Sequence, residues 1–179
     1  MKLRIVLLVA ALGYVTLAMG CKPKPAANSA SPAATATTIS KNAGPLPVNG
    51  FKAQITLSDP PAKLRAGQKE VITVKVKNTS DVVWWQRGGE INDRPDNKFY
   101  IAVGNRWLDK DGKPASETEG HSGISKDLKP GEEAEMTLQI TAPKQPGDYI
   151  LSLDMVQEGV NWFGDKGSPT TKVNVTVAK

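Results

Sequence analysis

Few residues of this chain could carry out nucleophilic or acid–base chemistry. Its one histidine, His121, precedes Ser122 in a Gly-His-Ser-Gly segment, and its one cysteine is Cys21. A Ser–His pair needs an imidazole held against the hydroxyl by a third group, but adjacent side chains of an extended segment point to opposite faces. We therefore expect His121 to be a solvated loop residue, and we predict no catalytic residues.

Acidic residues cluster between Asp109 and Glu119, where Asp109-Lys110-Asp111-Gly112 resembles the start of a calcium-binding loop. Such a loop needs further acidic positions and a glutamate at its twelfth position, which is Gly120 when counted from Asp109. A single His and a single Cys also exclude a zinc site rich in these residues, and any intrachain disulfide. The sequence predicts a solvated hairpin tip, no metal site and no cofactor.

A second acidic group comprises Glu90, Asp93 and Asp96 in a polar segment. Glycoside hydrolysis requires two carboxyl groups that face each other across a cleft, and the sequence does not place any pair in that way. A small carbohydrate-active enzyme, or an accessory domain of one, is therefore kept as the alternative to a binding protein.

The positive charge is confined to the N-terminal part of the chain. The sequence has 23 basic and 18 acidic residues, and five of the basic residues lie in residues 1–50, which contain no Asp or Glu. The remaining 18 basic residues balance the 18 acidic ones. Nucleic-acid binding needs a net basic, clustered surface, so we expect no nucleic-acid partner.

Residues 1–20 have the pattern of a secretory signal peptide. Lys2 and Arg4 precede an apolar run of 15 residues from Ile5 to Met19, which is short of the roughly 20 residues of a transmembrane helix. A buried core helix is the alternative, but nothing amphipathic follows the run.

The leader ends in Leu17-Ala18-Met19-Gly20-Cys21, which resembles the lipobox of bacterial lipoproteins. The resemblance implies that the leader is cut before Cys21 and that its thiol carries lipid, with palmitate among the acyl chains. An ordinary leader with a free thiol is the alternative. Lys22, in place of the Asp that retains many lipoproteins in the inner membrane, favours the outer membrane of a Gram-negative host.

Residues 21–49 are rich in Ala, Ser, Thr and Pro and lack apolar periodicity. Such a segment buries too little surface to offset the entropy of ordering. We interpret it as a flexible linker between the anchor and a folded domain at 50–179.

The domain consists of short runs in which apolar and polar residues alternate, a pattern typical of half-buried antiparallel strands. The runs lie at 51–57, 72–77, 99–103, 134–140, 149–155 and 172–177. With Pro-Gly and Asp-Gly turns between them, they predict an all-β fold, an immunoglobulin-like antiparallel sandwich of about seven strands. A closed barrel is the other architecture considered. Lys75 and Lys77 are expected to discourage edge-to-edge pairing.

Several motifs occur in an order that resembles the Ig-like domains of bacterial envelope proteins and glycosyltransferase tails, and the four-tryptophan Ig-like domain. They are Asn78-Thr79-Ser80, Trp84, Trp107, Leu128-Lys129-Pro130-Gly131, Ala142-Pro143, Pro146-Gly147-Asp148-Tyr149 and Glu158-Gly159-Val160-Asn161-Trp162-Phe163. The resemblance covers most of residues 64–177 and implies a fold and a binding or scaffolding role.

The family pattern places Trp84 in the core, which leaves its neighbour Trp85 at least partly exposed. Trp107 and Trp162 are expected to pack inside the sandwich. Trp85, together with Tyr100, is the predicted binding surface for a sugar ring or a partner protein.

These observations predict a lipid-anchored bacterial envelope protein, on the outer membrane if the host has one, that acts by binding. Its partners are the membrane, through the anchor, and either another envelope protein or a surface glycan. Loops at 86–96 and 109–123 are the expected contact sites. A structural spacer without a specific ligand is a further alternative.

Overall fold

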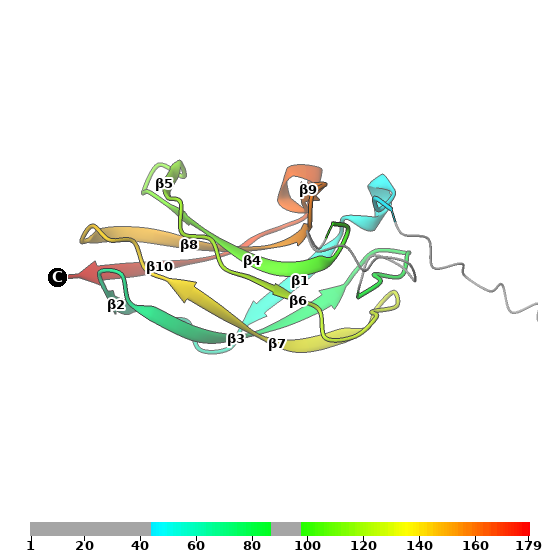
Figure 1. Ribbon diagram of the computed structural model, residues 1–179, viewed down its shortest axis with the longest axis horizontal. Coiled ribbons are helices and arrows are strands. Elements are labelled where there is room, and N and C mark those ends of the chain that lie inside the picture. Colours follow the sequence, from blue (N-terminus) through cyan, green and yellow to red (C-terminus); the bar gives the residue numbers. More distant parts are fainter. Residues whose placement is uncertain (1–43, 87–97) are drawn as a thin grey trace, which may run out of the picture. The chain divides into compact units, whose positions relative to one another are not determined.

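The folded part of the protein has two β-sheets packed face to face. The computed structural model describes residues 44–86 and 98–179, all within one compact unit (Figure 1). The smaller sheet has the order β1 (Ala53–Leu57), β3 (Lys69–Asn78), β7 (Glu133–Thr141). The larger sheet has the order β2 (Lys63–Arg65), β10 (Thr171–Ala178), β8 (Gly147–Gln157), β4 (Ile101–Leu108), β5 (Pro114–Ser116), with β6 (His121–Gly123) paired to β4 and β9 (Asn161–Trp162) paired to β8. Two short 3-10 turns, η1 (Val48–Gly50) and η2 (Gly164–Lys166), complete the described elements.

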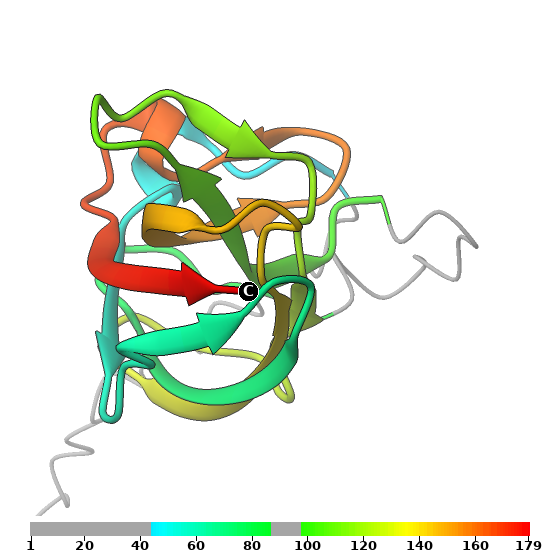
Figure 2. The same ribbon diagram turned by 90° about the vertical axis from the view of Figure 1, so that its left-hand side faces the viewer.

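The six alternating runs of the sequence correspond to the six longer strands, so the all-β sandwich is confirmed. The four strands of two or three residues were not predicted, because so short a segment has no measurable period. The sheets are not wholly antiparallel, since β2 pairs parallel to β10, beside it in Figure 2. Phe99 was wrongly included in a strand. It precedes β4 with a φ of 72°, and its N–H donates to the carbonyl of Glu158.

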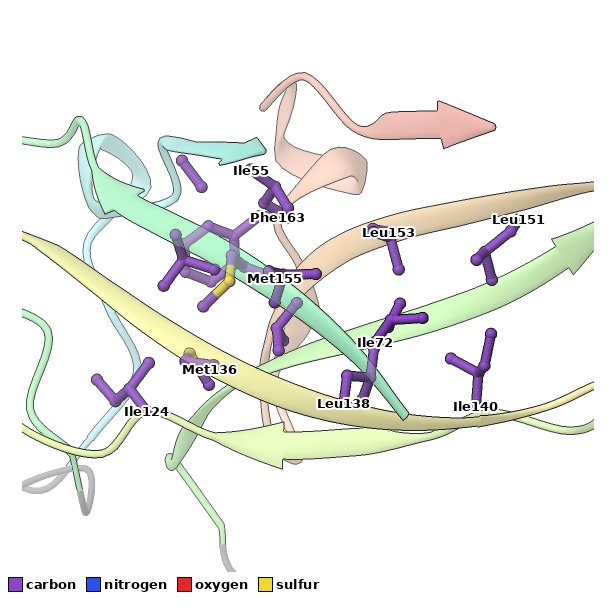
Figure 3. Packing of buried hydrophobic residues seen from close by; sticks show 14 of the residues in the cluster. Ile55, Ile72, Ile124, Met136, Leu138, Ile140, Leu151, Leu153, Met155 and Phe163 are labelled. Carbon is purple, nitrogen blue, oxygen red and sulfur yellow. The ribbon is translucent and has the colours of Figure 1, made fainter. Parts of the chain in front are cut away.

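The core lies between the inward faces of the two sheets. Alternate residues of β3 and β7 from one side meet alternate residues of β4 and β8 from the other (Figure 3). Trp84 and Trp107 are fully buried, as expected, and each indole N–H finds a backbone acceptor at 2.9 Å, on Gly50 and Thr141 respectively. Both rings therefore contribute apolar area without leaving a buried donor unsatisfied.

Asn78 holds the loop after β3 in place. Its amide nitrogen donates to the carbonyls of Val82 and Leu128, both at 2.8 Å, and its side-chain oxygen accepts from the N–H and hydroxyl of Ser80. The side chain is completely buried, and an unpaired amide there would be costly. The Asn-Thr-Ser motif therefore stabilises the conformation of this loop.

The edges of the smaller sheet are covered by segments of the larger one. On the β1 side, the hydroxyl of Ser168 accepts from Ala53 N–H, and that of Thr171 donates to the Ile55 carbonyl. On the β7 side, the hydroxyl of Thr118 donates to the Thr141 carbonyl. Covered edges cannot template pairing with another chain.

Lys75 and Lys77 were expected to discourage edge-to-edge pairing, but they do not lie on an edge strand, so this expectation was wrong. They lie on β3, the central strand, where they face Glu133 of β7 at 4.0 and 3.4 Å. Alternation alone does not tell a central strand from an edge strand.

The structure places part of the predicted linker against the domain. Buried Gln157 accepts from the N–H of Leu46 and donates to the carbonyl of Gly44, and Leu46 packs against the core. Residues 44–49 therefore contact the sandwich, although their composition resembles that of the linker. Within the described residues, no helix is both long and apolar enough to span a bilayer.

Candidate functional site

The outer face of the larger sheet carries the most ordered cluster of polar side chains among the described residues. Strand alternation turns Leu153 and Met155 of β8 into the core, so Asp154 and Val156 point outward. β9 pairs with β8 so that Trp162 lies opposite Val156 and also faces outward. Trp162 was expected inside the sandwich; its neighbour Phe163 takes that place instead, completely buried.

Gly104 of β4 makes room for this arrangement. A Cβ atom at Gly104 would lie 2.8 Å from Cη2 of Trp162 and 2.9 Å from Cδ2 of His121. Both distances are shorter than any ordinary contact between carbon atoms. The missing side chain therefore lets the indole and imidazole rings lie directly on the sheet.

Three side chains form what we call the Arg106 stack: Arg106, Trp162 and His121. The guanidinium carbon of Arg106 lies 3.9 Å from the centre of the Trp162 ring, and the His121 ring meets that indole edge-on at 5.2 Å. A cation over the face of an indole is attracted by its quadrupole. The stack fixes the orientation of a planar group that carries five N–H donors.

The donors of Arg106 are available to a ligand. Its ion pairs with Glu119 and Asp165 are 3.7 and 3.8 Å long, beyond the range of a hydrogen bond. Within the described part of the chain, Arg106 makes these two ion pairs and the ring contact but no hydrogen bond, and its side chain is 33% exposed. The guanidinium of Arg106 is therefore held in position while its N–H groups make no hydrogen bond to another described residue.

His121 is exposed, as the sequence suggested, but it belongs to a strand rather than to a loop. It lies on β6 opposite Gly104, and its Nδ1 is 2.8 Å from Oε1 of Glu158. A carboxylate accepts, so Nδ1 carries the hydrogen, and Nε2 faces Glu119 at 3.7 Å. Ser122 instead borders a separate hollow with Glu135 and Thr137. The two neighbours thus have different surroundings, as expected for an extended segment.

Asp154 is a buried carboxylate beside the Arg106 stack. The residue is 4% exposed, and its oxygens accept from the N–H groups of Gly164 at 2.9 Å and Met155 at 2.8 Å. Burial raises the pKa of Asp154, although these hydrogen bonds and the charge of Arg106 oppose the shift. Its remaining lone pairs make it a strong acceptor at the base of a groove.

The groove lies between the β4–β5 hairpin and η2, which both rise from the same side of the larger sheet (Figure 1). Its volume is about 430 Å³. Its charged and polar lining comprises Arg106, Ser116, Glu119, Ser152, Asp154, Asp165, Ser168, Thr170 and Lys172. Trp107, Leu108 and Pro114 supply its apolar lining. A second hollow of about 380 Å³ continues along β8 and β10 beside Ile150, Asn174 and Thr176. The two hollows have no lining residue in common, but both border β8 and β10.

The structure does not bring the predicted binding residues to this groove. Trp85 and Tyr100 are half-buried at either end of residues 87–97, and neither borders the groove. The partial exposure of Trp85 beside buried Trp84 agrees with expectation, but its binding role remains a prediction. Cys21, the leader, and the carboxylates Glu90, Asp93 and Asp96 lie outside the described residues.

Asp109 closes its own turn. Its carboxylate accepts from the N–H groups of Asp111 and Lys113, and the hydrogen bond from Lys113 lowers the pKa of Asp109. Gly112, at a φ of 79°, completes the Asp-Gly hairpin. Among the described residues, no group of three His, Cys, Asp or Glu side chains is arranged to hold a metal ion.

Sequence reasoning missed Arg106, Glu119, Asp154 and Asp165 as a group. The available signal was the polar residue at 154 within an otherwise apolar β8 run, together with a glycine and an arginine two residues apart on β4. Neither signal indicates which face of the sheet Asp154 or Arg106 occupies, or which segments cover that face.

No family model and no curated protein matches the chain. Among solved structures, it is similar to the CARDB domain of the PF1109 protein of Pyrococcus furiosus, crystallised with di-metal ions, with a TM-score of 0.38 and 15% identity over 71% of this chain and 86% of that one. It is also similar to Spo0M, a sporulation control protein of Bacillus subtilis, with a TM-score of 0.40 and 17% identity over 72% and 49% of the two chains. A β-glucosidase of Listeria innocua in complex with glucose gives a TM-score of 0.36 and 15% identity over 69% of this chain and 16% of that chain.

These likenesses are remote, so the Ig-like β-sandwich assignment stands on the sheets and core of this chain. A fold does not by itself define a function, so the chemistry of this chain must be argued from its own residues.

Proposed function

We propose that this chain is a lipid-anchored protein of the bacterial cell envelope whose Ig-like domain binds another envelope protein or a surface glycan without catalysis. The lipobox-like ending at Cys21 supports the anchor, and Lys22 favours the outer membrane. Two or more acyl chains are enough for stable membrane attachment.

The observation that carries the binding role is the Arg106 stack at the groove. The guanidinium of Arg106 is held 3.9 Å from the centre of the Trp162 ring. Its N–H groups make ion pairs but no hydrogen bond with other described residues. An ordered group with spare donors costs little entropy when it meets a ligand. The stack is thus preorganised for recognition.

The anchor is tested by labelling cells with a radioactive or clickable fatty acid. We expect label on the wild-type chain and none on Cys21→Ala, with membrane fractionation lost in parallel. A wild-type chain without label, in a host that labels another lipoprotein, contradicts the anchor.

The binding role is tested by cross-linking the chain in intact cells and comparing the wild type with Arg106→Ala. We expect an envelope component to be captured by the wild type and reduced in the variant. Equal capture by both proteins contradicts the role of the groove. No enriched component favours the structural spacer.

One observation favours the enzymatic alternative. Asp154, with its raised pKa, shares the groove with Glu119 and Asp165, and glycosidases use a protonated carboxyl group beside an ionised one. Hydrolysis of an oligosaccharide by the wild type that disappears in Asp154→Asn would replace the binding proposal with this alternative.

A further inference from the structure

We infer that the groove between the β4–β5 hairpin and η2 binds a neutral, hydroxyl-rich glycan chain. The inference rests on the proposed binding function and names the chemistry of its ligand. Four properties of the groove lead to it: its pairing of donors with acceptors, its charge, its shape and the burial of its large apolar side chains.

The groove offers strong donors and strong acceptors side by side. Arg106 and Lys172 can only donate, whereas the carboxylates of Glu119, Asp154 and Asp165 accept. A sugar hydroxyl both donates and accepts, so a run of hydroxyls can bond to alternating groups of both kinds. Ser152 and Thr170 on the same surface add hydroxyls that adapt to either role.

The charge of the groove disfavours anionic polymers. Three carboxylates and two cationic side chains give the lining a formal charge of −1. An anionic chain would meet the three carboxylates at short range, and like charges brought close together weaken association. Nucleic acids and acidic glycans therefore fit less well than an uncharged chain.

The shape suits an extended ligand. The groove of about 430 Å³ is open on its outer side, and the hollow of about 380 Å³ also lies along β8 and β10. A small molecule usually enters a site that encloses most of its surface. A chain of several sugar units can instead lie along the strands and contact both hollows.

A protein partner fits this surface less well. Protein interfaces are centred on aromatic or aliphatic anchors that fill apolar pockets. Among the described residues, the large apolar side chains that are well exposed are Val48 and Val71, and neither borders the groove. Trp107 and Leu108 also line the groove, but both are buried and offer a protein little anchoring surface. We therefore favour a glycan over a protein.

The test is isothermal titration of the full chain, in a zwitterionic detergent without sugar groups, against four neutral hexasaccharides. These are cellohexaose, laminarihexaose, maltohexaose and chitohexaose; hexagalacturonate is the anionic comparison. We expect at least one neutral hexasaccharide to bind more tightly than hexagalacturonate.

Two nearly isosteric variants locate the binding. Arg106→Lys keeps the charge but loses the planar fork, and Asp154→Asn keeps the volume but loses the carboxylate. Each should weaken the bound hexasaccharide about tenfold or more, as expected for hydrogen bonds to charged groups. Lys77→Ala, on the opposite sheet, should leave affinity unchanged, and thermal unfolding of each variant checks that it folds.

Three results overturn the inference: no neutral hexasaccharide binds, hexagalacturonate binds more tightly, or both groove variants bind as the wild type does. In any of these cases the proposed envelope-binding role survives if fatty-acid labelling and cross-linking succeed. Capture of a protein through Arg106 together with no sugar binding would assign the groove to a protein partner.

Discussion

The two outer faces of the sandwich are built by the same strand alternation but differ in what they can do. On the smaller sheet, β3 and β7 alternate buried and outward residues along most of their length, and Lys77 and Glu133 face each other as a surface pair. On the larger sheet, the outward positions include buried Asp154 and the stacked Arg106.

The difference arises from what lies above each sheet. On the larger sheet, Trp162 of β9 lies opposite Val156, and Gly164 of η2 donates to Asp154; both Asp154 and Val156 are buried. On the smaller sheet, Val71 remains 61% exposed. A polar strand face becomes a site only when other elements remove water from it and fix its side chains.

The largest effect should come from filling the space under Trp162. Gly104→Ala puts a Cβ within 3 Å of two rings, and we expect the free energy of unfolding to fall by about 3 kcal/mol, measured by urea denaturation. Gly123→Ala is the matched control, because a Cβ there meets only the Ile101 carbonyl at 3.9 Å. Equal losses in the two variants would contradict the packing described for the Arg106 stack.

Asp154→Ala should destabilise the fold by about 2 kcal/mol, since it leaves the N–H groups of Gly164 and Met155 without their acceptor. Asp148→Ala on the same strand removes an exposed carboxylate bonded to Thr176 and should cost well under half as much. A smaller loss at Asp154 than at Asp148 would mean that the outer face of β8 is solvated.

A change of pH should distinguish wild type from Asp154→Asn. Because burial raises the pKa of Asp154, the folded state binds its proton more tightly than the unfolded state does. The contribution of this carboxyl group to stability is therefore present below its unfolded pKa, near 3.8, and is lost as pH rises through the folded pKa. We expect the stability of the wild type relative to Asp154→Asn to fall as the pH rises from the unfolded pKa to the folded pKa, and then to level off. Urea denaturation at successive pH values measures this difference. A constant difference contradicts the burial effect.

Arg106→Ala should lower stability by about 1 kcal/mol, the size of a partly exposed cation–π contact. Its fluorescence signature is more specific, because removing the guanidinium changes the surroundings of Trp162 but not those of buried Trp84 or Trp107. Arg65→Ala, at an exposed position of β2, is the control. An unchanged emission spectrum in Arg106→Ala would argue against the stack.

The smallest effect belongs to the smaller sheet. Lys77→Ala breaks a 3.4 Å ion pair between exposed side chains, and such pairs contribute less than about 1 kcal/mol. We expect a change below about 0.5 kcal/mol in the same urea assay. A loss as large as that of Arg106→Ala would remove the contrast between the two faces.

Much of the fold could be predicted from the sequence, because the strands depend on local periodicity. The run Ala134, Met136, Leu138, Ile140 predicted β7 with its inward face, and Asp111-Gly112 predicted the hairpin tip. β9 has only two residues, which are too few to show a period. No pattern along the chain therefore predicted that Trp162 and Phe163 lie on opposite faces of the larger sheet.

The candidate site was harder to predict, because its members come from four separate segments. These members are Arg106, Glu119 with His121, Asp154 and Trp162. They meet through pairings between distant parts of the chain, such as that of β4 with β8, in which Ile101 lies opposite Gln157. Which strand is central, as for Lys77, and which glycine leaves room for a ring, as for Gly104, depend on those pairings.

The sequence by itself determined the alternating strands, the turns, the neutral charge of the domain and the position of Cys21 just after an apolar run, since each follows from composition or from neighbours along the chain. Only the tertiary structure decided that the outer face of the larger sheet is covered and that Arg106 is stacked beside a buried Asp154. Strand order and the packing of short segments are set by long-range contacts, whose free energy is not encoded in any single stretch of residues.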